Sequence, residues 1–256
     1  MIPLSDNAGI RRRFPIINYL LIALNILAFI AQAQYGSCFT AAYAVVPYAI
    51  THGQALAVTG CPYGEPSPVY VTLLTSMFLH GSLLHIAGNM LYLWIFGDNV
   101  EDRLGHFWYF VFYLFCGLAA SIAQIAVIPN STLLNLGASG AIAGVLGAYL
   151  IFFPAARVRT FIFLGIFFTL ASIPAVVLIG FWFVLQLLSG VASLSPAVAQ
   201  SGGVAYFAHV GGFVAGLVIA VLVRAMSRPS RQYPQQSYPY WPRYPSLEHD
   251  YNEDKW

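Results

Sequence analysis

The chain has 256 residues, of which 59% are hydrophobic and only 8% are charged. Water-soluble domains carry about 25% charged residues, so this composition excludes a soluble globular protein and predicts a membrane protein. The net charge of +2 argues against a nucleic-acid partner, which would need a basic face. The mean hydropathy of +0.72 argues against disorder over most of the length.

Six apolar segments are each long enough to cross a membrane as a helix, which takes roughly 20 residues. The sequence therefore predicts an all-α membrane protein, a six-helix bundle occupying residues 14–226. The expected spans are 14–34, 75–97, 105–128, 134–153, 160–186 and 204–226. Residues 227–256 are rich in Pro and Tyr and predict a disordered cytoplasmic tail, with a tail that docks a partner as the alternative.

The basic residues predict the orientation of the bundle, because Lys and Arg in short loops stay on the cytoplasmic side. All 11 precede the first segment, lie at or beyond the end of the sixth, or lie between the second and third or the fourth and fifth. Residues 1–13 and the other terminus should therefore be cytoplasmic, and loops 35–74, 129–133 and 187–203 should face outward. The first segment also resembles a cleaved signal peptide, through three arginines, an apolar stretch and Ala31-Gln32-Ala33.

The three cysteines are too few for a disulfide framework. Cys116 is expected to pack within the third helix. Cys38 and Cys61 share the first outward loop, where an oxidising compartment would permit a bridge. Both the bridge and two free thiols remain open.

Polar side chains inside the spans are few, and each is a candidate functional residue because burying it in the bilayer is costly. His85 and Asn89 are spaced i and i+4, so they share one face of the second helix. Ser139 and His209 each lie about five residues after the expected start of an inward-running helix, so both should lie roughly 8 Å below the outer boundary. His80 lies nearer the outside.

Glycines flank the serine and the last histidine. Gly140 and Gly144 form a G-x-x-x-G pattern in the fourth span, and Gly212 and Gly216 form another in the sixth. Backbone packing alone would explain either pattern. Close approach of the two helices would also bring Ser139 within hydrogen-bonding reach of His209.

The sequence lacks the motifs of three kinds of hydrolytic site. The stretch from Gly137 to Ala141 is not a G-x-S-x-G nucleophile elbow, and the sequence contains no H-E-x-x-H zinc motif. The spans have no pair of deep carboxylates for an aspartyl protease. A serine and histidine pair remains.

In these residues the chain resembles the rhomboid intramembrane serine proteases, in their compact six-helix prokaryotic form. The resemblance covers nearly everything before the tail. It is carried by His80-x4-His85-x3-Asn89, by the stretch from Gly97 to Gly105, by Gly137-x-Ser139-Gly140-x3-Gly144, and by Ala208-His209-x2-Gly212-x3-Gly216.

The resemblance implies that Ser139 is the nucleophile and His209 the general base, a dyad without a third acid. Asn89 and His85, with the backbone N–H of Ser139, would stabilise the oxyanion, and His80 would steady the outer loop. The implied substrates are transmembrane segments of single-pass proteins, cut near the outer face of a bacterial cytoplasmic membrane with no cofactor. Substrate would enter beside the fifth helix, where Pro174 suits a gate and residues 189–203 suit a lid.

Two departures from the family pattern are expected to affect details of stability and not the dyad. Ala143 replaces an aromatic residue that would stack on the histidine, so His209 needs other support, from Tyr206 or another aromatic. The first loop also lacks a Trp-Arg pair found in some relatives. The alternatives to a protease are a catalytically silent rhomboid-like protein that binds membrane clients, and a small transporter or channel lined by His85, Asn89 and His209.

Overall fold

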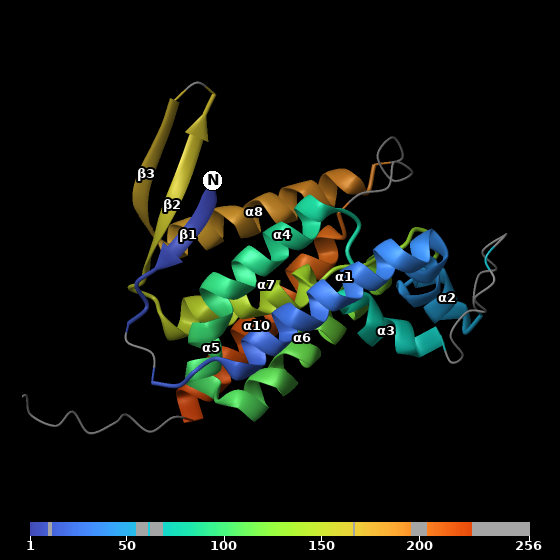
Figure 1. Ribbon diagram of the computed structural model, residues 1–256, viewed down its shortest axis with the longest axis horizontal. Coiled ribbons are helices and arrows are strands. Elements are labelled where there is room, and N and C mark those ends of the chain that lie inside the picture. The colour runs from blue at the N-terminus through green and yellow to red at the C-terminus, as the bar shows by residue number, and fades with distance from the viewer. Residues whose placement is uncertain (10–11, 55–60, 62–68, 166, 196–203, 227–256) are drawn as a thin grey trace, which may run out of the picture. The chain divides into compact units, whose positions relative to one another are not determined.

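The computed structural model describes residues 1–9, 12–54, 61, 69–165, 167–195 and 204–226. The chain divides into two units, Met1–Met226 and Ser227–Trp256, and the expected tail lies outside the described residues. Figure 1 shows a helical bundle with a small sheet beside it. The longer helices are α1 (Ile16–Tyr43), α4 (Leu83–Tyr92), α6 (His106–Val127), α7 (Ser139–Phe152), α8 (Ala175–Ser193) and α10 (Tyr206–Met226).

The helices confirm the predicted helical membrane bundle. Within the described residues, four helices are long and apolar enough to cross a membrane: α1, α6, α8 and α10. The bent pair Val69–Phe78 and Leu83–Leu104, with an angle of 77° between its halves, makes a fifth if it forms one span. This pair comprises the short elements η1 (Val69–Val71), α3 (Thr72–Thr75) and η2 (Ser76–Phe78), then α4, η3 (Leu93–Gly97) and α5 (Asp98–Leu104).

Helix α7 lies at the centre of the bundle, because every residue from Gly140 to Tyr149 is buried. Its glycines let the backbone of α10 pack directly against the backbone of α7. A Cβ atom added at Gly212 would overlap the carbonyl oxygen of Gly140, and one added at Gly216 would overlap that of Gly144. The two G-x-x-x-G patterns therefore form one helix–helix interface, as close packing of small residues in a bilayer requires.

Two carboxylates of α5 hydrogen-bond the backbone at the start of α1. Glu101, fully buried, accepts hydrogen bonds from the backbone N–H groups of Ile17 at 3.0 Å and Asn18 at 2.7 Å. Asp102 accepts from the N–H groups of Arg12 and Arg13. These donors belong to the first turn of α1 and the chain just before it, where N–H groups have no helical partner and a negative charge is favourable.

The fifth predicted span, 160–186, is wrong over its first half. Residues 157–174 form the antiparallel hairpin β2 (Arg157–Leu164) and β3 (Phe167–Pro174), and β1 (Ile2–Asp6) pairs with β2 to give the order β1-β2-β3. Gly165, with φ of 67°, lies at the turn. Hydropathy measures how apolar a segment is and not its backbone conformation. It therefore cannot distinguish one long apolar helix from two apolar strands.

Two further expectations are corrected by the same region. Pro174 does not interrupt a helix: it immediately precedes α8, where a missing N–H costs nothing. Residues 189–193, expected within a lid, continue α8, and residues 196–203 lie outside the described part of the chain.

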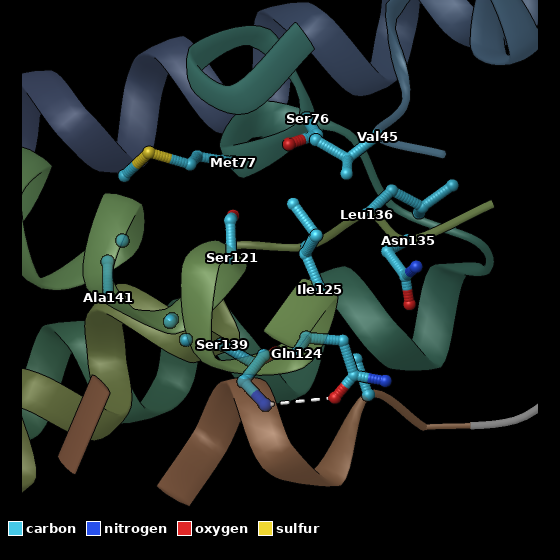
Figure 2. Close-up of a pocket in the computed structure, with 16 residues that line it drawn as sticks. Val45, Ser76, Met77, Ser121, Gln124, Ile125, Asn135, Leu136, Ser139 and Ala141 are labelled. Atoms are coloured by element: carbon cyan, nitrogen blue, oxygen red, sulfur yellow. Dashed lines mark hydrogen bonds between the residues drawn. The ribbon is translucent and has the colours of Figure 1, made fainter. Parts of the chain in front are cut away.

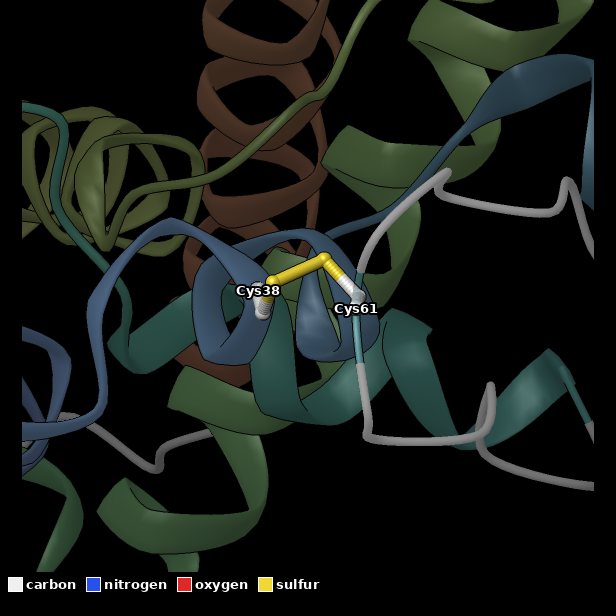
Figure 3. Close-up of a disulfide and its surroundings, with 2 residues drawn as sticks. All are labelled: Cys38 and Cys61. Atoms are coloured by element: carbon white, nitrogen blue, oxygen red, sulfur yellow. A yellow bond between two sulfur atoms is a disulfide. The ribbon is translucent and has the colours of Figure 1, made fainter.

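On the predicted outer side, α1 runs beyond its expected end at residue 34 to Tyr43, and Gly36, with φ of 75°, breaks its helical geometry. The short helix α2 (Pro47–His52) follows. Cys38 and Cys61 form a disulfide, which resolves the alternative left open by the sequence (Figure 3). Cys116 is a buried free thiol in α6.

Candidate active site

Ser139 is the first residue of α7, and not a residue five positions inside a helix that starts at 134. Gly137 explains the later start. Its φ of 134° is not helical, and its N–H donates to the carbonyl oxygen of Ser76 at 2.9 Å. Residues 134–138 therefore run outside a helix, and the backbone N–H of Ser139 falls in the first turn, where amide donors have no helical partner.

His209 contacts Ser139 directly. Its Nε2 lies 2.7 Å from the Ser139 Oγ, so the two small-residue helices bring the hydroxyl and the imidazole into hydrogen-bonding distance, as the sequence predicts. His209 is 7% exposed, in the first turn of α10. An imidazole that accepts the hydroxyl proton at Nε2 must carry its own proton on Nδ1.

The second nitrogen of His209 contacts a residue that the sequence analysis missed. Its Nδ1 lies 2.7 Å from Oε1 of Gln186 in α8. One turn earlier on the same helix, the ring of Trp182 lies 5.7 Å from the His209 ring, with an angle of 38° between the planes. Trp182 thus supplies the aromatic support that Ala143 cannot, and among the described residues no ring contact joins His209 and Tyr206.

His85 presents a hydrogen-bond donor to the same site. The N–H of Gly81 donates to its Nδ1 at 3.3 Å, so the neutral ring carries its proton on Nε2. A Cβ atom added at Gly137 would stand 2.9 Å from His85 Cε1, 3.0 Å from His85 Nε2 and 3.5 Å from Ser139 Oγ. Gly137 therefore keeps open the space between this donor and the serine.

Asn89 lies one turn further along α4. It is 8% exposed, and its Nδ2 is a buried donor without a hydrogen-bond partner among the described residues. An unpaired buried amide is costly, so such a group commonly marks a site that binds something else. His80 does not join this site directly: its ring packs edge-on to His85 at 5.0 Å, while Gln32 of α1 binds its backbone at both N–H and C=O.

A cavity of about 630 Å³ brings together four of the polar residues predicted from the sequence. Its walls come from the length of α4, residues 134–136, the first half of α7, one residue of α8, and the start of α10 with the residues just before it. The polar lining includes His85, Asn89, Ser139 and His209, and the apolar lining includes Leu146 and Trp182. The cavity is large enough for several residues of an extended peptide beside the serine.

Ser139 also lines a second, smaller cavity of about 40 Å³ (Figure 2). Ser76, Ser121 and Gln124 provide polar atoms along its wall, and Gln124 Oε1 accepts a hydrogen bond from the N–H of Ala208 at 3.1 Å. A polar space of this volume has room for a few water molecules. In the described residues, no group of three or more His, Cys, Asp or Glu side chains could hold a metal ion.

A profile of the Rhomboid domain matches residues 68–226, which is more than half of the chain. The chain belongs to the rhomboid family. The match includes both G-x-x-x-G patterns and every residue of the site described above.

Curated relatives agree with this membership. The chain is 28% identical over 170 residues to "Rhomboid protein 1, mitochondrial" of Saccharomyces cerevisiae, covering 63% of this chain and 44% of the relative. It is 36% identical over 137 residues to "Rhomboid protease GluP" of Bacillus subtilis, covering 53% and 24%. It is 36% identical over 97 residues to "Presenilin-associated rhomboid-like protein, mitochondrial" of Mus musculus, covering 37% and 26%.

The chain thus spans less than half the length of these relatives, and only GluP among the three is named a protease. The chain is an integral multi-pass membrane protein of the rhomboid family.

Proposed function

We propose that this protein is an intramembrane serine endopeptidase, and that Ser139 and His209 perform the cleavage as a dyad. The observation that carries the proposal is the 2.7 Å contact between Ser139 Oγ and His209 Nε2. A serine hydroxyl is a poor nucleophile until a neighbouring base takes its proton, and this contact supplies the base.

In the proposed reaction, Oγ attacks the scissile carbonyl carbon while His209 takes the hydroxyl proton. The carbonyl oxygen becomes an oxyanion, which is stabilised by Asn89 Nδ2–H, His85 Nε2–H and the backbone N–H of Ser139. His209 then gives its proton to the leaving amine, which leaves an acyl ester on Ser139. Water, activated by His209, hydrolyses the ester and regenerates the serine.

The environment of the dyad supports this assignment. Both imidazole nitrogens of His209 have neutral partners, Ser139 and Gln186, so the dyad works without a third acid. The free Nδ2 of Asn89 and the protonated Nε2 of His85 are donors of the kind that an oxyanion requires. The 40 Å³ cavity next to Ser139 offers room for the water that hydrolysis consumes.

The proposed substrates are transmembrane segments of single-pass proteins, cut near the outer face of the membrane. The catalytic groups lie at the ends of α7 and α10 opposite to the cluster of basic residues, which the positive-inside rule assigns to the cytoplasm. A substrate helix must unwind to present an extended backbone, so small or helix-weakening residues near the cut are expected to favour cleavage. The location would be a bacterial cytoplasmic membrane, with both termini inside.

The test uses purified protein in liposomes with a model transmembrane substrate. We expect cleavage by the wild type and no measurable cleavage by Ser139→Ala or His209→Ala, and we expect a fluorophosphonate probe to label wild type but not Ser139→Ala. Leu188→Met, a change on the exposed face of α8, is the control and should cleave normally. Cleavage that survives both substitutions would overturn the dyad, whereas a wild type that binds the substrate but never cuts it would support a silent client-binding protein.

A further inference from the structure

Gln186 occupies an unusual place for an amide side chain, on a helix that is otherwise apolar. Helix α8, from Ala175 to Ser193, is apolar enough to cross a membrane, and most of its large side chains are exposed. Gln186 hydrogen-bonds the imidazole of His209, with its Oε1 at 2.7 Å from Nδ1. A polar side chain in such a span is costly, so it is a candidate functional residue by default.

We propose that Gln186 is a positioning residue that holds His209 in the tautomer required of a general base. This inference rests on the proposed function. An unconstrained neutral imidazole exchanges its proton between the two nitrogens, and only the form protonated on Nδ1 has a lone pair at Nε2 for the serine proton. The amide oxygen of Gln186 accepts the Nδ1–H and thereby selects that form.

A neutral acceptor suits this position better than a carboxylate would. Position 186 is half-buried in an apolar helix, where a carboxylate without a cation partner would cost more than a neutral amide. The amide oxygen fixes the tautomer and ring orientation by geometry. Trp182, one turn earlier, packs against the ring at 5.7 Å, so two residues of α8 hold the base from different directions.

The consequence is that the serine, its base and the proposed positioning residue come from three different helices. Ser139 belongs to α7 and His209 to α10, which are packed rigidly through their glycines, whereas Gln186 belongs to α8. Helix α8 buries only Ala175, Leu178, Ile179 and Gly190. Displacement of α8 would withdraw Gln186 and Trp182 together, so the base is correctly held only while α8 is docked against α10.

The experiment compares Gln186→Met, which keeps the length of the side chain and removes the acceptor, with Leu188→Met on the exposed face of the same helix. For a transmembrane substrate, Gln186→Met is expected to lower kcat by about tenfold, the scale of one net hydrogen bond, with KM unchanged. Leu188→Met should match the wild type. An unchanged kcat, or an increase in KM alone, would overturn the inference, because the latter would mean that Gln186 contacts substrate.

A second readout does not depend on catalysis. In protein labelled with 15N-histidine, the 15N chemical shifts show which nitrogen of His209 carries the proton, with His209→Gln used to assign its signals. We expect the Nδ1–H form in the wild type and a mixture of tautomers in Gln186→Met. A wild type that cleaves nothing would defeat the proposed function, whereas an unaltered tautomer in Gln186→Met would defeat this inference.

Gln186→Glu keeps the test decisive if Gln186→Met does not fold. The isosteric carboxyl group retains an acceptor, so more of kcat should survive than in Gln186→Met. It also places a titratable group against the imidazole, so the pH profile of kcat/KM should change from that of the wild type. An identical profile would show that the side chain at 186 does not act on His209.

Discussion

Asn89 carries a donor without a partner among the described residues, although its side chain is 8% exposed. Replacing it by Leu should lower kcat by about 10²–10³-fold, the usual cost of one oxyanion donor, because the transition state loses a hydrogen bond that the substrate does not make. The same change removes an unsatisfied buried amide, so thermal stability should stay equal or rise. Kinetics and a melting curve on one preparation check both.

The opposite pattern would identify Asn89 as a structural residue. A lower melting temperature with nearly normal kcat would mean that its amide stabilises the fold. Leu91→Met, a conservative change on the same helix, is the matched control and should alter neither quantity.

The site residues show what side-chain chemistry can and cannot reveal in a sequence. Ser139, His209, His85 and Asn89 stand out because polar groups are rare in apolar spans, and the structure brings all four to one cavity. Gln186 lies at the last position of the expected span 160–186, where a polar side chain is ordinary. A sequence signal did exist, because Trp182 and Gln186 share one helix face at i and i+4, but nothing in the sequence shows that this face meets His209.

At the level of helices, the α7–α10 interface depends on glycines that have no room for a side chain. Gly216→Ala should destabilise the protein by about 1–3 kcal/mol, because its Cβ would overlap the carbonyl oxygen of Gly144 and force the helices apart. Gly180→Ala in α8 is the control: nothing lies within 4 Å of its added Cβ, so stability should be equal or slightly higher. Thermal unfolding in detergent measures both variants. Equal melting temperatures would contradict the tight interface.

Substrate entry is expected beside α8. Because Pro174 lies before this helix and not inside it, any movement would involve the whole helix. A Cβ atom added at Gly190 would lie 3.3 Å from the Cβ of Tyr206, close to the spacing of a disulfide. Oxidising a Gly190→Cys, Tyr206→Cys variant should therefore pin α8 to α10. We expect cleavage of a transmembrane substrate to fall at least tenfold and to recover on reduction, while fluorophosphonate labelling of Ser139 persists.

The wild type with and without reductant controls for the Cys38–Cys61 disulfide in that experiment. Full cleavage by the cross-linked variant would show that substrate reaches Ser139 without movement of α8 at this end.

The hairpin β2–β3 shows that hydropathy alone does not predict whether an apolar segment forms a helix or strands. Residues 160–174 satisfy the composition of a membrane helix, yet they pair as strands from Arg157↔Pro174 to Leu164↔Phe167. The signal that favours strands was present: aromatic and β-branched residues flank Gly165 on both sides. The G-x-x-x-G interface was predictable because spacing alone defines it, whereas the docking of β1 on β2 joins residues more than 150 positions apart and leaves no local pattern.

For the whole molecule, the distribution of charge predicts which side of the membrane each end of the bundle faces. Ser5 in β1 and His52 in α2 are both exposed, on the predicted cytoplasmic and outer sides respectively. In intact cells, a membrane-impermeant maleimide should label His52→Cys, and should label Ser5→Cys only after permeabilisation. The unaltered chain is the control and should not react, because Cys38 and Cys61 are paired and Cys116 is buried.

The reverse labelling pattern would show that the bundle has the opposite orientation in the membrane. The orientation also decides where the products of the proposed reaction are released. Ser139 and His209 lie at the helix ends remote from the basic residues, so the side that labels at position 52 is the side on which the cavity opens. Labelling from outside would mean that the cleaved fragment is released outward. Labelling from inside would mean that the same dyad releases fragments into the cytoplasm, and the positive-inside rule would then fail for this chain.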